Sequence, residues 1–576
     1  MKNQIKKVRL LLQTLSHLRL RQIAYQLVRR VRKVKYVAME APAGSAPLSL
    51  VRPIDKPVCV EGEEFSFLNL SAQFSDWNDD GYGSLWAYNL NYMDWLGQPN
   101  LSVEERLGWI ERFMKDFPRV VIGRDPYPTA LRTLNWVKFF SLYPDKQSVR
   151  YDNALYSQLR MLASNLEYHL LGNHLLEDAY ALFVGSIYFA DAKLYNVAKT
   201  LLQKELEEQI LPDGAHFEQS PMYHCILLDR LLDAYNASSN NLRFPDQYEI
   251  TAFLQAKAEA MLGHLNAIAY ADGSIPLLND SAEDIAPKSN EIFAYAKRLG
   301  VMWHNRPMRE VGYRKLHDEN WEAIVDVGNI MAPYQCGHTH ADTFTFELRK
   351  DGKPIVVDTG ISTYDKTPRR LYERGTLAHN TVSVDGRNSS EVWSGFRVGK
   401  RAKVYMLLDE ASRVAALHNG YKNIVHVRGF QVANGEFIVE DYLSNQAEGY
   451  NIIHFAPSQS VHVNEDMSIV TDDVTIHIQG ADEIKLTKEM VSSKYNQLAE
   501  GSAAQIKFKG KMKFVFIINS AQNQRCIKRV NEFVERGYDV ETYAFSRGTE
   551  MRNKHNFDLQ IIGEFANDTS YLSRLN

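Results

Sequence analysis

The spacing of apolar residues divides the chain into two parts with different periods. Between about residues 80 and 300, apolar positions recur every three or four residues, as in the leucines of residues 155–170. That spacing places them on one face of a helix. Short breaks that contain Gly, Pro or Asn, at 171–173, 211–214 and 279–281, separate helices of ordinary length. The first part is therefore predicted to consist of stacked antiparallel helix pairs.

The period becomes two after about residue 315. Residues 343–348 alternate polar and apolar side chains, residues 354–357 are apolar, and the turn pair Asp351-Gly352 stands between them. Further strand-like runs occur at 381–384, 435–439, 474–478 and 512–518. The second part is predicted to be an antiparallel β-sandwich. The expected organisation is a basic N-terminal segment at 1–40, a helical domain at 41–315 and a sandwich domain at 316–576.

The N-terminal segment is basic. Residues 1–39 hold eleven Lys or Arg residues and no acidic residue, and Arg19, Arg21 and Arg29-Arg30 interrupt the apolar stretches. An export signal needs a longer apolar region, and the chain has no run of roughly 18 apolar residues that could span a membrane. We therefore expect a cytoplasmic protein. Two interpretations of the segment stay open: a basic helix resting on an anionic membrane face, and a solvated helix packed on its own domain.

Composition narrows the class of protein. The 576 residues are 45% hydrophobic and 24% charged, which excludes wholesale disorder. The 66 Lys and Arg against 70 Asp and Glu give a net charge of −4, so no overall field favours nucleic acid. Cysteines at 59, 225, 336 and 526 show no C-x-x-C spacing, which argues against a disulfide framework or a thiolate zinc site. No nucleotide-binding loop is found, and no organic cofactor is implied.

Residues 220–224 (Ser-Pro-Met-Tyr-His) precede an apolar helical run. Ser220 is suited to the N-cap and Pro221 to the first helical position, which places Tyr223 in the first turn. The positive end of the helix dipole would lower the pKa of the Tyr223 phenol from its reference value near 10, so that it could serve as a base. The alternative is that Tyr223 and His224 only pack against a neighbouring helix.

Residues 172–174 (Gly-Asn-His) stand at the opening of another predicted helix. Asn is among the best N-cap residues, so capping alone would explain Asn173. A similar pattern at a second helix start argues for a functional role beyond capping. Two helix starts about fifty residues apart each present a polar donor followed by His, as stacked hairpins that open into one cleft would.

Residues 337–348 (Gly-His-Thr-His-Ala-Asp-Thr-Phe-Thr-Phe-Glu-Leu) form the most specific string. If they are one strand, two histidines and an aspartate share a face with two phenylalanines. An H-x-H pair on a strand is a metal-ligand spacing, and Asp358 or His379 could complete the set. A plain hairpin at Asp351-Gly352 would place Asp358 about 20 Å along the strand from His340. A metal site therefore needs a bulge, a longer loop or another pairing.

Taken in order, the strings resemble the heparinase II/III-like family of polysaccharide lyases, and the likeness covers most of the chain. The strings that carry it are 85–90 (LWAYNL), 125–132 (DPYPTALR), 172–174 (GNH), 220–224 (SPMYH), 337–342 (GHTHAD), 357–360 (VDTG) and 378–381 (AHNT). The resemblance implies an α+β multidomain protein, with an N-terminal incomplete (α/α) toroid, a C-terminal antiparallel β-sandwich and an active cleft between them. It agrees with the change of period.

Members of this family look like β-eliminating lyases that cleave the bond at C4 of a uronic acid. The C5 proton is weakly acidic, so such an enzyme needs a base beside C5 and groups that stabilise the enolate-like carboxylate. By resemblance, Asn173 with His174 would bind the carboxylate. Tyr223, which His224 follows in the same catalytic string, would accept the C5 proton or donate one to O4. His338 would be the other acid or base, or would neutralise charge.

The resemblance also implies a metal site and substrate contacts. The residues that match a structural site for zinc, or another divalent metal, are His340, Asp358 and His379. Arg132, Tyr364 and Arg374 would contact the substrate. An Arg fork suits a carboxylate, although a surface ion pair would explain Arg374 equally well. The implied partner is an anionic polysaccharide or oligosaccharide.

Two departures from the family pattern leave the biological role open. Secreted lyases of this kind carry an export signal, which we do not expect here. The strings around Trp86 and Tyr127 are closer to heparinase-like proteins associated with bacterial surface-polysaccharide production, so the substrate could be a nascent exopolysaccharide. Three alternatives remain: a non-catalytic polysaccharide-binding or assembly protein, a metallohydrolase built on the His338-x-His340 pair, and a hydrolase that uses carboxylates. The carboxylates proposed for a hydrolase are Asp178, Asp213 and Glu218.

Overall fold

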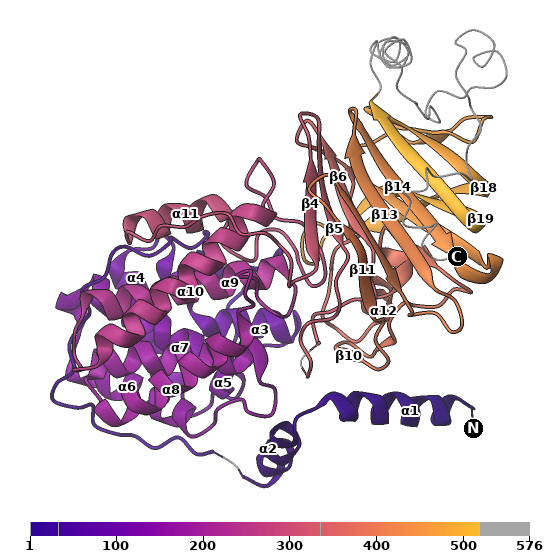
Figure 1. The fold of residues 1–576 in the computed structure, drawn as a ribbon. Coiled ribbons are helices and arrows are strands. Elements are labelled where there is room, and N and C mark those ends of the chain that lie inside the picture. The colour runs from indigo at the N-terminus through magenta and orange to yellow at the C-terminus, as the bar shows by residue number, and fades with distance from the viewer. Residues whose placement is uncertain (1, 33, 335, 519–576) are drawn as a thin grey trace.

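The computed structural model describes residues 2–32, 34–334 and 336–518, which form a helical part and a sheet part lying side by side (Figure 1). The last helix of the helical part ends at Arg298, and the first strand of the large sheet begins at Tyr313. The predicted fold class, α+β multidomain with helices first and antiparallel strands second, is confirmed. The predicted sandwich domain runs to residue 576, and residues 519–576 lie outside the described residues.

The helical part contains a short three-stranded sheet and nine described helices. Its strands are β1 (Val60–Glu61), β2 (Glu64–Phe67) and β3 (Leu70–Gln73). Its helices are α3 (Ser84–Tyr92), α4 (Val103–Asp116), α5 (Pro126–Leu142), α6 (Val149–Ala163), α7 (Gly172–Phe189), α8 (Ala192–Gln209), α9 (Pro221–Asn240), α10 (Gln247–Ile268) and α11 (Ser289–Arg298). Consecutive helices pack as pairs, α7 with α8 and α9 with α10. Helix α7 is buried along almost its whole length, so it forms the centre of this part.

Polar caps fix where several of these helices begin. Ser102 closes a capping box with Glu105 at the start of α4, and Ser148 caps α6. The predicted helix face at 155–170 is correct only in part. Helix α6 ends at Ala163, so Leu166 and Leu170 lie beyond it, in the turn that leads to α7. Leu166 still packs against the hydrophobic core from this turn.

The sheet part is one antiparallel sheet of fourteen strands within the described residues. Its strands are β4 (Tyr313–His317), β5 (Trp321–Asp326), β6 (Phe346–Lys350), β7 (Lys353–Val356), β8 (Val382–Ser383), β11 (Val404–Asp409), β12 (Arg413–His418), β13 (His426–Ala433), β14 (Glu436–Leu443), β15 (Glu448–Phe455), β16 (His462–Val463), β17 (Ile469–Val470), β18 (Val474–Val491) and β19 (Ala499–Ile518). Strands β4 and β13 touch although they are far apart in strand order, so the sheet folds back on itself in two layers (Figure 1). Smaller elements beside it are α12 (Pro368–Glu373), β9 (Val392–Trp393) and β10 (Arg397–Val398).

The four strand-like runs beyond residue 380 lie in β8, β14, β18 and β19, as predicted. The turn pair Asp351-Gly352 closes the β6–β7 hairpin with positive φ at both residues, the conformation of a two-residue hairpin turn. A bulge lies between Leu348 and Arg349. Residues 337–348 do not form the single strand that was considered for them, because β6 begins at Phe346.

Residues 337–345 instead form an irregular loop in front of β6. The Thr345 amide donates to the Asp342 carbonyl at 2.7 Å, and Phe344 has a φ of 70°. Phe344 is nevertheless fully buried in the sheet core. The apolar position is therefore buried as expected although the backbone turns, but the polar neighbours Thr343 and Thr345 are buried as well. This loop carries His338 and His340 toward the helical part.

Buried polar contacts join the two parts. The Tyr270 hydroxyl donates to the Glu347 carboxylate at 2.7 Å, and the same carboxylate accepts from the Leu277 amide at 3.0 Å. The Gln219 amide donates to the carbonyls of Val311 and Asn329 at 2.8 and 3.0 Å. Because these groups satisfy one another away from water, they favour one relative placement of the two parts.

Helices α1 (Lys2–His17) and α2 (Leu20–Val31) lie along one side of the molecule, beneath both parts (Figure 1). Helix α1 packs beside β10, and Thr14 donates to the Val398 carbonyl at 3.3 Å. Helix α2 lies on the helical part, where the Gln22 amide donates to the Leu170 carbonyl at 3.0 Å. Neither these helices nor any other helix in the described part of the chain is long and apolar enough to cross a bilayer.

Candidate active site

The start of helix α9 presents Tyr223 at the junction of the two parts. Ser220 is the N-cap, and its hydroxyl accepts from the Tyr223 amide at 3.2 Å and donates to the Asp280 carbonyl at 2.6 Å. Pro221 occupies the first helical position. These local predictions are confirmed. The cap also ties the helix start to the segment that follows α10.

The Tyr223 ring lies against the His338 ring, with centroids 4.0 Å apart and the planes tilted by 32°. Its hydroxyl is 3.4 Å from the Tyr364 hydroxyl. The expected lowering of the Tyr223 pKa is wrong. Burial raises this pKa above its ordinary value, and the carboxylates of Asp280 and Glu218 raise it further. In the resting site Tyr223 is a neutral phenol, which can donate a proton.

The start of helix α7 presents Asn173. Leu171 and Gly172 both have positive φ, 62° and 58°, so the chain enters this helix through a sharp turn. Asn173 follows Gly172 inside the first turn, so it is not the N-cap and capping does not explain it. Its side-chain amide donates to the Glu218 carboxylate at 2.8 Å and lies 3.4 Å from Nε2 of His338. The two helix starts therefore meet at one histidine.

His174 occupies the next position and keeps 28% of its side chain exposed. Its Nδ1 lies 3.0 Å from the Glu167 carboxylate, and its ring is 4.8 Å from the Tyr127 ring. Burial alone would lower the pKa of His174, but Glu167, together with Glu218 and Glu177, raises it. His174 therefore lies at the edge of the site, and its surroundings favour the protonated, positively charged imidazole.

Asp280 organises the histidine pair. One carboxylate oxygen lies 2.8 Å from Nδ1 of His338, and the other lies 2.8 Å from Nε2 of His340. Arg370 donates to both oxygens, at 2.5 and 2.7 Å. Although burial would raise the pKa of Asp280, Arg370 and the two histidines hold it well below its usual range. An ionised carboxylate accepts a hydrogen bond, so Nδ1 of His338 donates to Asp280, and Nε2 faces Asn173 and Glu218.

Sequence reasoning missed Asp280 and Arg370, and it considered Glu218 only as a hydrolase residue. Asp280 was part of a predicted break between helices, and no spacing links it to residue 338. Glu218 lies 3.6 Å from Nε2 of His338 and holds Asn173 by both its backbone and side-chain amides. Its place two residues before the Ser220 cap was the one signal available. Such contacts depend on the tertiary fold, which sequence spacing does not encode.

Three predicted site residues lie away from the group of side chains around His338. His224 is buried behind Tyr223, with Nε2 3.0 Å from the Met261 carbonyl, so it faces the helical core. Arg132 is fully buried and donates to Gln158 and to the Asn91 carbonyl. Arg374 is also fully buried, and it donates to the Thr339 carbonyl at 2.7 Å. None of the three can reach a sugar, and Arg374 instead supports the loop between His338 and His340.

Tyr364, in contrast, lies at the site. Its hydroxyl faces Tyr223, and its ring is 6.1 Å from the His338 ring. The Arg370 guanidinium lies 5.0 Å from the Tyr364 ring, so the arginine that binds Asp280 also packs beneath this side chain. Phe396, which is 39% exposed, contacts the same ring at 5.5 Å. Aromatic side chains therefore border the site on the sheet side.

The residues predicted to hold zinc lie together. His379 Nδ1 is 2.7 Å from the Asp358 carboxylate, and the rings of His340 and His379 are 5.2 Å apart. Nδ1 of His340 and Nε2 of His379 are buried without a hydrogen-bond partner in the described chain. Imidazole nitrogens of this kind are chemically suited to bind a metal ion. Within the same residues, however, no group of three or more His, Cys, Asp or Glu side chains is arranged to hold an ion. The zinc assignment stays a prediction that elemental analysis would test.

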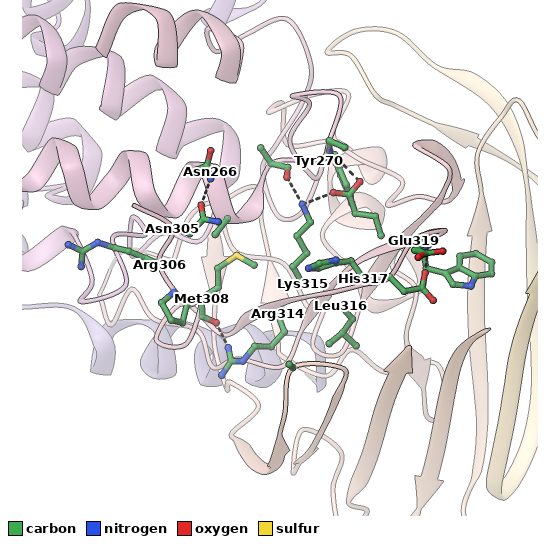
Figure 2. A pocket seen from close by; sticks show the side chains of 18 of the residues that line it. Asn266, Tyr270, Asn305, Arg306, Met308, Arg314, Lys315, Leu316, His317 and Glu319 are labelled. Atoms are coloured by element: carbon green, nitrogen blue, oxygen red, sulfur yellow. Dashed lines mark hydrogen bonds and ion pairs between the residues drawn. The ribbon is translucent and has the colours of Figure 1, made fainter. Parts of the chain in front are cut away.

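A hollow of about 1040 Å³ lies elsewhere along the junction of the two parts (Figure 2). Its labelled lining includes Asn266, Arg306, Arg314, Lys315 and Glu319, and none of the residues around His338. Two of its cations are paired, Lys315 with Glu322 at 2.5 Å and Arg314 with Asp409 at 2.8 Å, and Arg306 donates to the Pro212 carbonyl at 3.2 Å. Size alone therefore does not mark this hollow as the functional site.

The sequence matches two models of one family. The heparinase II/III N-terminus model matches residues 134–300, and the heparinase II/III-like C-terminal model matches residues 302–531. Together these matches take up more than half of the chain. The chain belongs to the heparinase II/III-like family.

Curated relatives include heparin-sulfate lyases from two bacteria. The protein from Bacteroides stercoris is 24% identical over 342 residues, which are 53% of this chain and 49% of the relative. The protein from Pedobacter heparinus is 25% identical over 350 residues, or 54% and 49% of the two chains. The chain thus spans about half the length of the curated relatives it matches.

Solved structures share the fold. Heparinase III superposes with a TM-score of 0.62 at 16% identity, covering 78% of this chain and 80% of that one. A mutant of heparan sulfate lyase HepC from Pedobacter heparinus gives a TM-score of 0.54 at 18% identity, covering 86% and 87%. At these identities the likeness establishes the architecture, and the chemistry must be argued from the site.

Proposed function

We propose that this protein is a polysaccharide lyase that cleaves the bond at C4 of a uronic acid by β-elimination. The observation that carries the proposal is the contact between Tyr223 and His338, with Asn173 beside them. A proton donor, a proton acceptor and an amide donor meet there, contributed by both parts of the molecule. Family membership and the heparin-sulfate lyase relatives support the same reaction class.

In the proposed reaction, Nε2 of His338 accepts the proton from C5. Asp280 holds the other ring nitrogen, which fixes the tautomer and stabilises the cation that forms. The C5–H electrons form the C4–C5 double bond, and the bond from C4 to O4 breaks. Tyr223 donates its phenolic proton to the departing O4, which agrees with its raised pKa. The product has a 4,5-unsaturated uronate at its new end.

Asn173 and His174 are proposed to bind the sugar carboxylate. The second hydrogen of the Asn173 amide and the cationic form of His174 would stabilise the negative charge that grows on the carboxylate as the C5 proton leaves. Glu218 already accepts from Asn173 at this point. An incoming carboxylate must therefore share that amide with Glu218. When His338 takes up the proton during the reaction, its positive charge stabilises the two carboxylates that then lie close together.

The arrangement also bears on stereochemistry. Because the Tyr223 and His338 rings are in contact, the acid and the base reach the sugar from one side. Elimination from one side requires the C5 hydrogen and the C4 oxygen on the same face of the ring, as in glucuronic and mannuronic acids. Galacturonic, guluronic and iduronic acids have these groups on opposite faces and are expected to react poorly.

The proposal is tested by incubating the purified protein with polysaccharides that contain each of these uronic acids, including surface polysaccharides of bacteria. A lyase produces ultraviolet absorbance from the conjugated product, and a hydrolase produces new reducing ends without it. Absorbance confined to glucuronate or mannuronate polymers is the expected result. New reducing ends without absorbance would favour a hydrolase, and neither signal on any polymer would favour a binding or assembly protein.

The hydrolase alternative has weaker support from the described contacts. Of its three carboxylates, Asp178 accepts from the Glu167 amide and Asp213 accepts from the Val311 amide, both in buried positions. Glu218 alone of the three contacts the site around His338. A role in bacterial exopolysaccharide production, and a cytoplasmic location, remain predictions from the sequence.

A further inference from the structure

Helices α1 and α2 each attach to the protein by one face only. On α1, Leu10 is buried and Thr14 bonds with Val398 and Trp393 of the sheet part. On α2, Gln22 is buried and bonds with Leu170 of the helical part. We call these two helices the strap, because they run across both parts on one side of the molecule (Figure 1).

The opposite face of the strap is apolar and open to solvent. On α1 the exposed apolar residues recur at intervals of three and four, which places them on one stripe. On α2 the stripe continues, with Leu20 and Val31 each 85% exposed. The residues of the stripe are Ile5, Val8, Leu12, Leu15, Leu20, Leu27, Val28 and Val31. Exposed apolar residues scattered singly are ordinary, whereas eight on adjoining helices form a contact surface.

The charged residues of the strap are all positive. Between residues 4 and 32 the sequence has eight Lys or Arg residues and no acidic residue. Arg9, Arg19 and Arg29 anchor the strap through Glu391, Glu208 and Asp125. Lys6, Lys7, Arg30 and Arg32 are exposed, and no acidic partner is recorded for them in the described chain. A partner that covers the stripe must therefore be apolar and must also bring negative charge.

We propose that the strap docks on an anionic phospholipid bilayer, with both helices parallel to the surface. Apolar residues on one side of a helix, flanked by lysine and arginine, are the pattern of interfacial helices. A second copy of the chain would bring two equally basic stripes together, and their like charges would repel. The inference does not depend on the lyase chemistry, because no strap residue belongs to the candidate active site.

The test is sedimentation of the full-length protein with vesicles. We expect binding to vesicles of phosphatidylglycerol and phosphatidylcholine, and much weaker binding to phosphatidylcholine alone. Lys6→Gln with Lys7→Gln should weaken binding to the anionic vesicles about thirtyfold, since each surface cation contributes on the order of 1 kcal/mol. Leu12→Gln with Leu27→Gln should weaken it at least about tenfold through lost apolar contact.

Matched controls lie elsewhere on the surface. Lys115→Gln with Lys193→Gln removes two exposed charges, and Leu242→Gln with Leu142→Gln removes two exposed leucines, from the helical part. These variants should bind as the unmodified protein does. Circular dichroism would verify that every variant keeps its fold.

Three results would overturn the proposal. The first is equal binding to neutral and anionic vesicles. The second is unchanged binding by the strap variants, or equal loss in the controls. The third is the absence of vesicle binding together with a dimer, measured by analytical ultracentrifugation, that Leu12→Gln with Leu27→Gln dissociates, because the stripe would then be an interface between copies.

Discussion

Tyr223 makes few contacts that depend on its hydroxyl. The hydroxyl is 3.4 Å from that of Tyr364, while the ring packs on His338. Tyr223→Phe should therefore keep the packing and remove the proposed proton donor. A positioned acid or base contributes about 10²- to 10⁴-fold in rate, so we expect turnover to fall by that range with an unchanged melting temperature. Product absorbance and thermal denaturation measure the two quantities.

His338→Ala should have an equal effect on turnover, since it removes the proposed base. Tyr405→Phe serves as the control, because it removes the hydroxyl of an exposed tyrosine that lies on β11, outside the candidate active site. If either Tyr223→Phe or His338→Ala retained more than about a tenth of the original rate, the proposed role of that residue would be wrong.

His174 supplies a pH-dependent prediction. Glu167 raises its pKa, so the cationic form persists below the raised value and is lost as the pH rises through it. Glu167→Gln removes the carboxylate while burial remains, which lowers the His174 pKa. The alkaline limb of the kcat/KM profile should therefore move to lower pH in this variant. The profile of His174→Gln should lack that limb, and an unmoved limb in Glu167→Gln would assign it to another group.

At this scale the sequence indicated Asn173, Tyr223 and His338 correctly as residues that come together, but not the groups that hold them. Asp280 and Glu218 bind these side chains from segments with no recognisable spacing to them. The Tyr223 pKa was predicted in the wrong direction for a related reason. A helix dipole can be anticipated from a cap motif, whereas burial by a second part of the molecule cannot.

Among the elements, α9 carries the most specific prediction. The Ser220 hydroxyl both caps this helix and binds the Asp280 carbonyl. It therefore links the backbone of Tyr223 to Asp280, the residue that binds His338. Ser220→Ala should cost about 1 kcal/mol of unfolding free energy through the lost cap. It should also reduce kcat, because Tyr223 and Asp280 are no longer held in register. Denaturant unfolding and product absorbance measure the two effects.

Ser148 provides the matched control for Ser220. It caps α6 in the same way, by accepting from the Tyr151 amide, and it lies outside the candidate active site. Ser148→Ala should lose a similar amount of stability and keep full activity. Equal activity in both variants would show that the α9 cap serves stability only.

The periodicity of the sequence predicts elements well where the backbone is regular. It places the β6–β7 turn and the N-terminus of α9 correctly. It fails at residues 337–345, where Phe344 is buried from an irregular loop, and at Leu166 and Leu170, which lie in a turn after α6. At Phe344 and Leu166 the apolar pattern continues because these side chains still pack in the core, and packing in the core does not require a strand or a helix.

At the scale of the whole molecule, Asp280 joins the two parts. It follows the last long helix of the helical part and binds His338, His340 and Arg370 of the sheet part. Asp280→Asn leaves the buried Arg370 without its counter-ion, so we expect a loss of about 3 kcal/mol of unfolding free energy at neutral pH. Urea unfolding measures this loss.

The pH dependence of that loss has a definite sign. Arg370 and the histidines lower the folded-state pKa of Asp280, so its stabilising effect is complete above its unfolded pKa of about 4. The effect is lost as the pH falls through the lowered folded value. The stability gap between the unmodified protein and Asp280→Asn should therefore be constant from neutral pH to about pH 5 and narrow below about pH 4. Asp385→Asn, at an exposed aspartate, should show almost no gap at any pH.

The link between α1 and α2 limits how far the two parts can swing apart. Helix α1 is fastened to the sheet part and α2 to the helical part, and only Leu18 and Arg19 connect them. Two extended residues span at most about 7 Å. A larger separation of the two parts would require one helix to lose its contacts with the part that it is bound to. Because the apolar stripe lies on the face opposite these anchors, docking on a bilayer would leave the anchors in place, and the two parts should be held together at a surface as they are in solution.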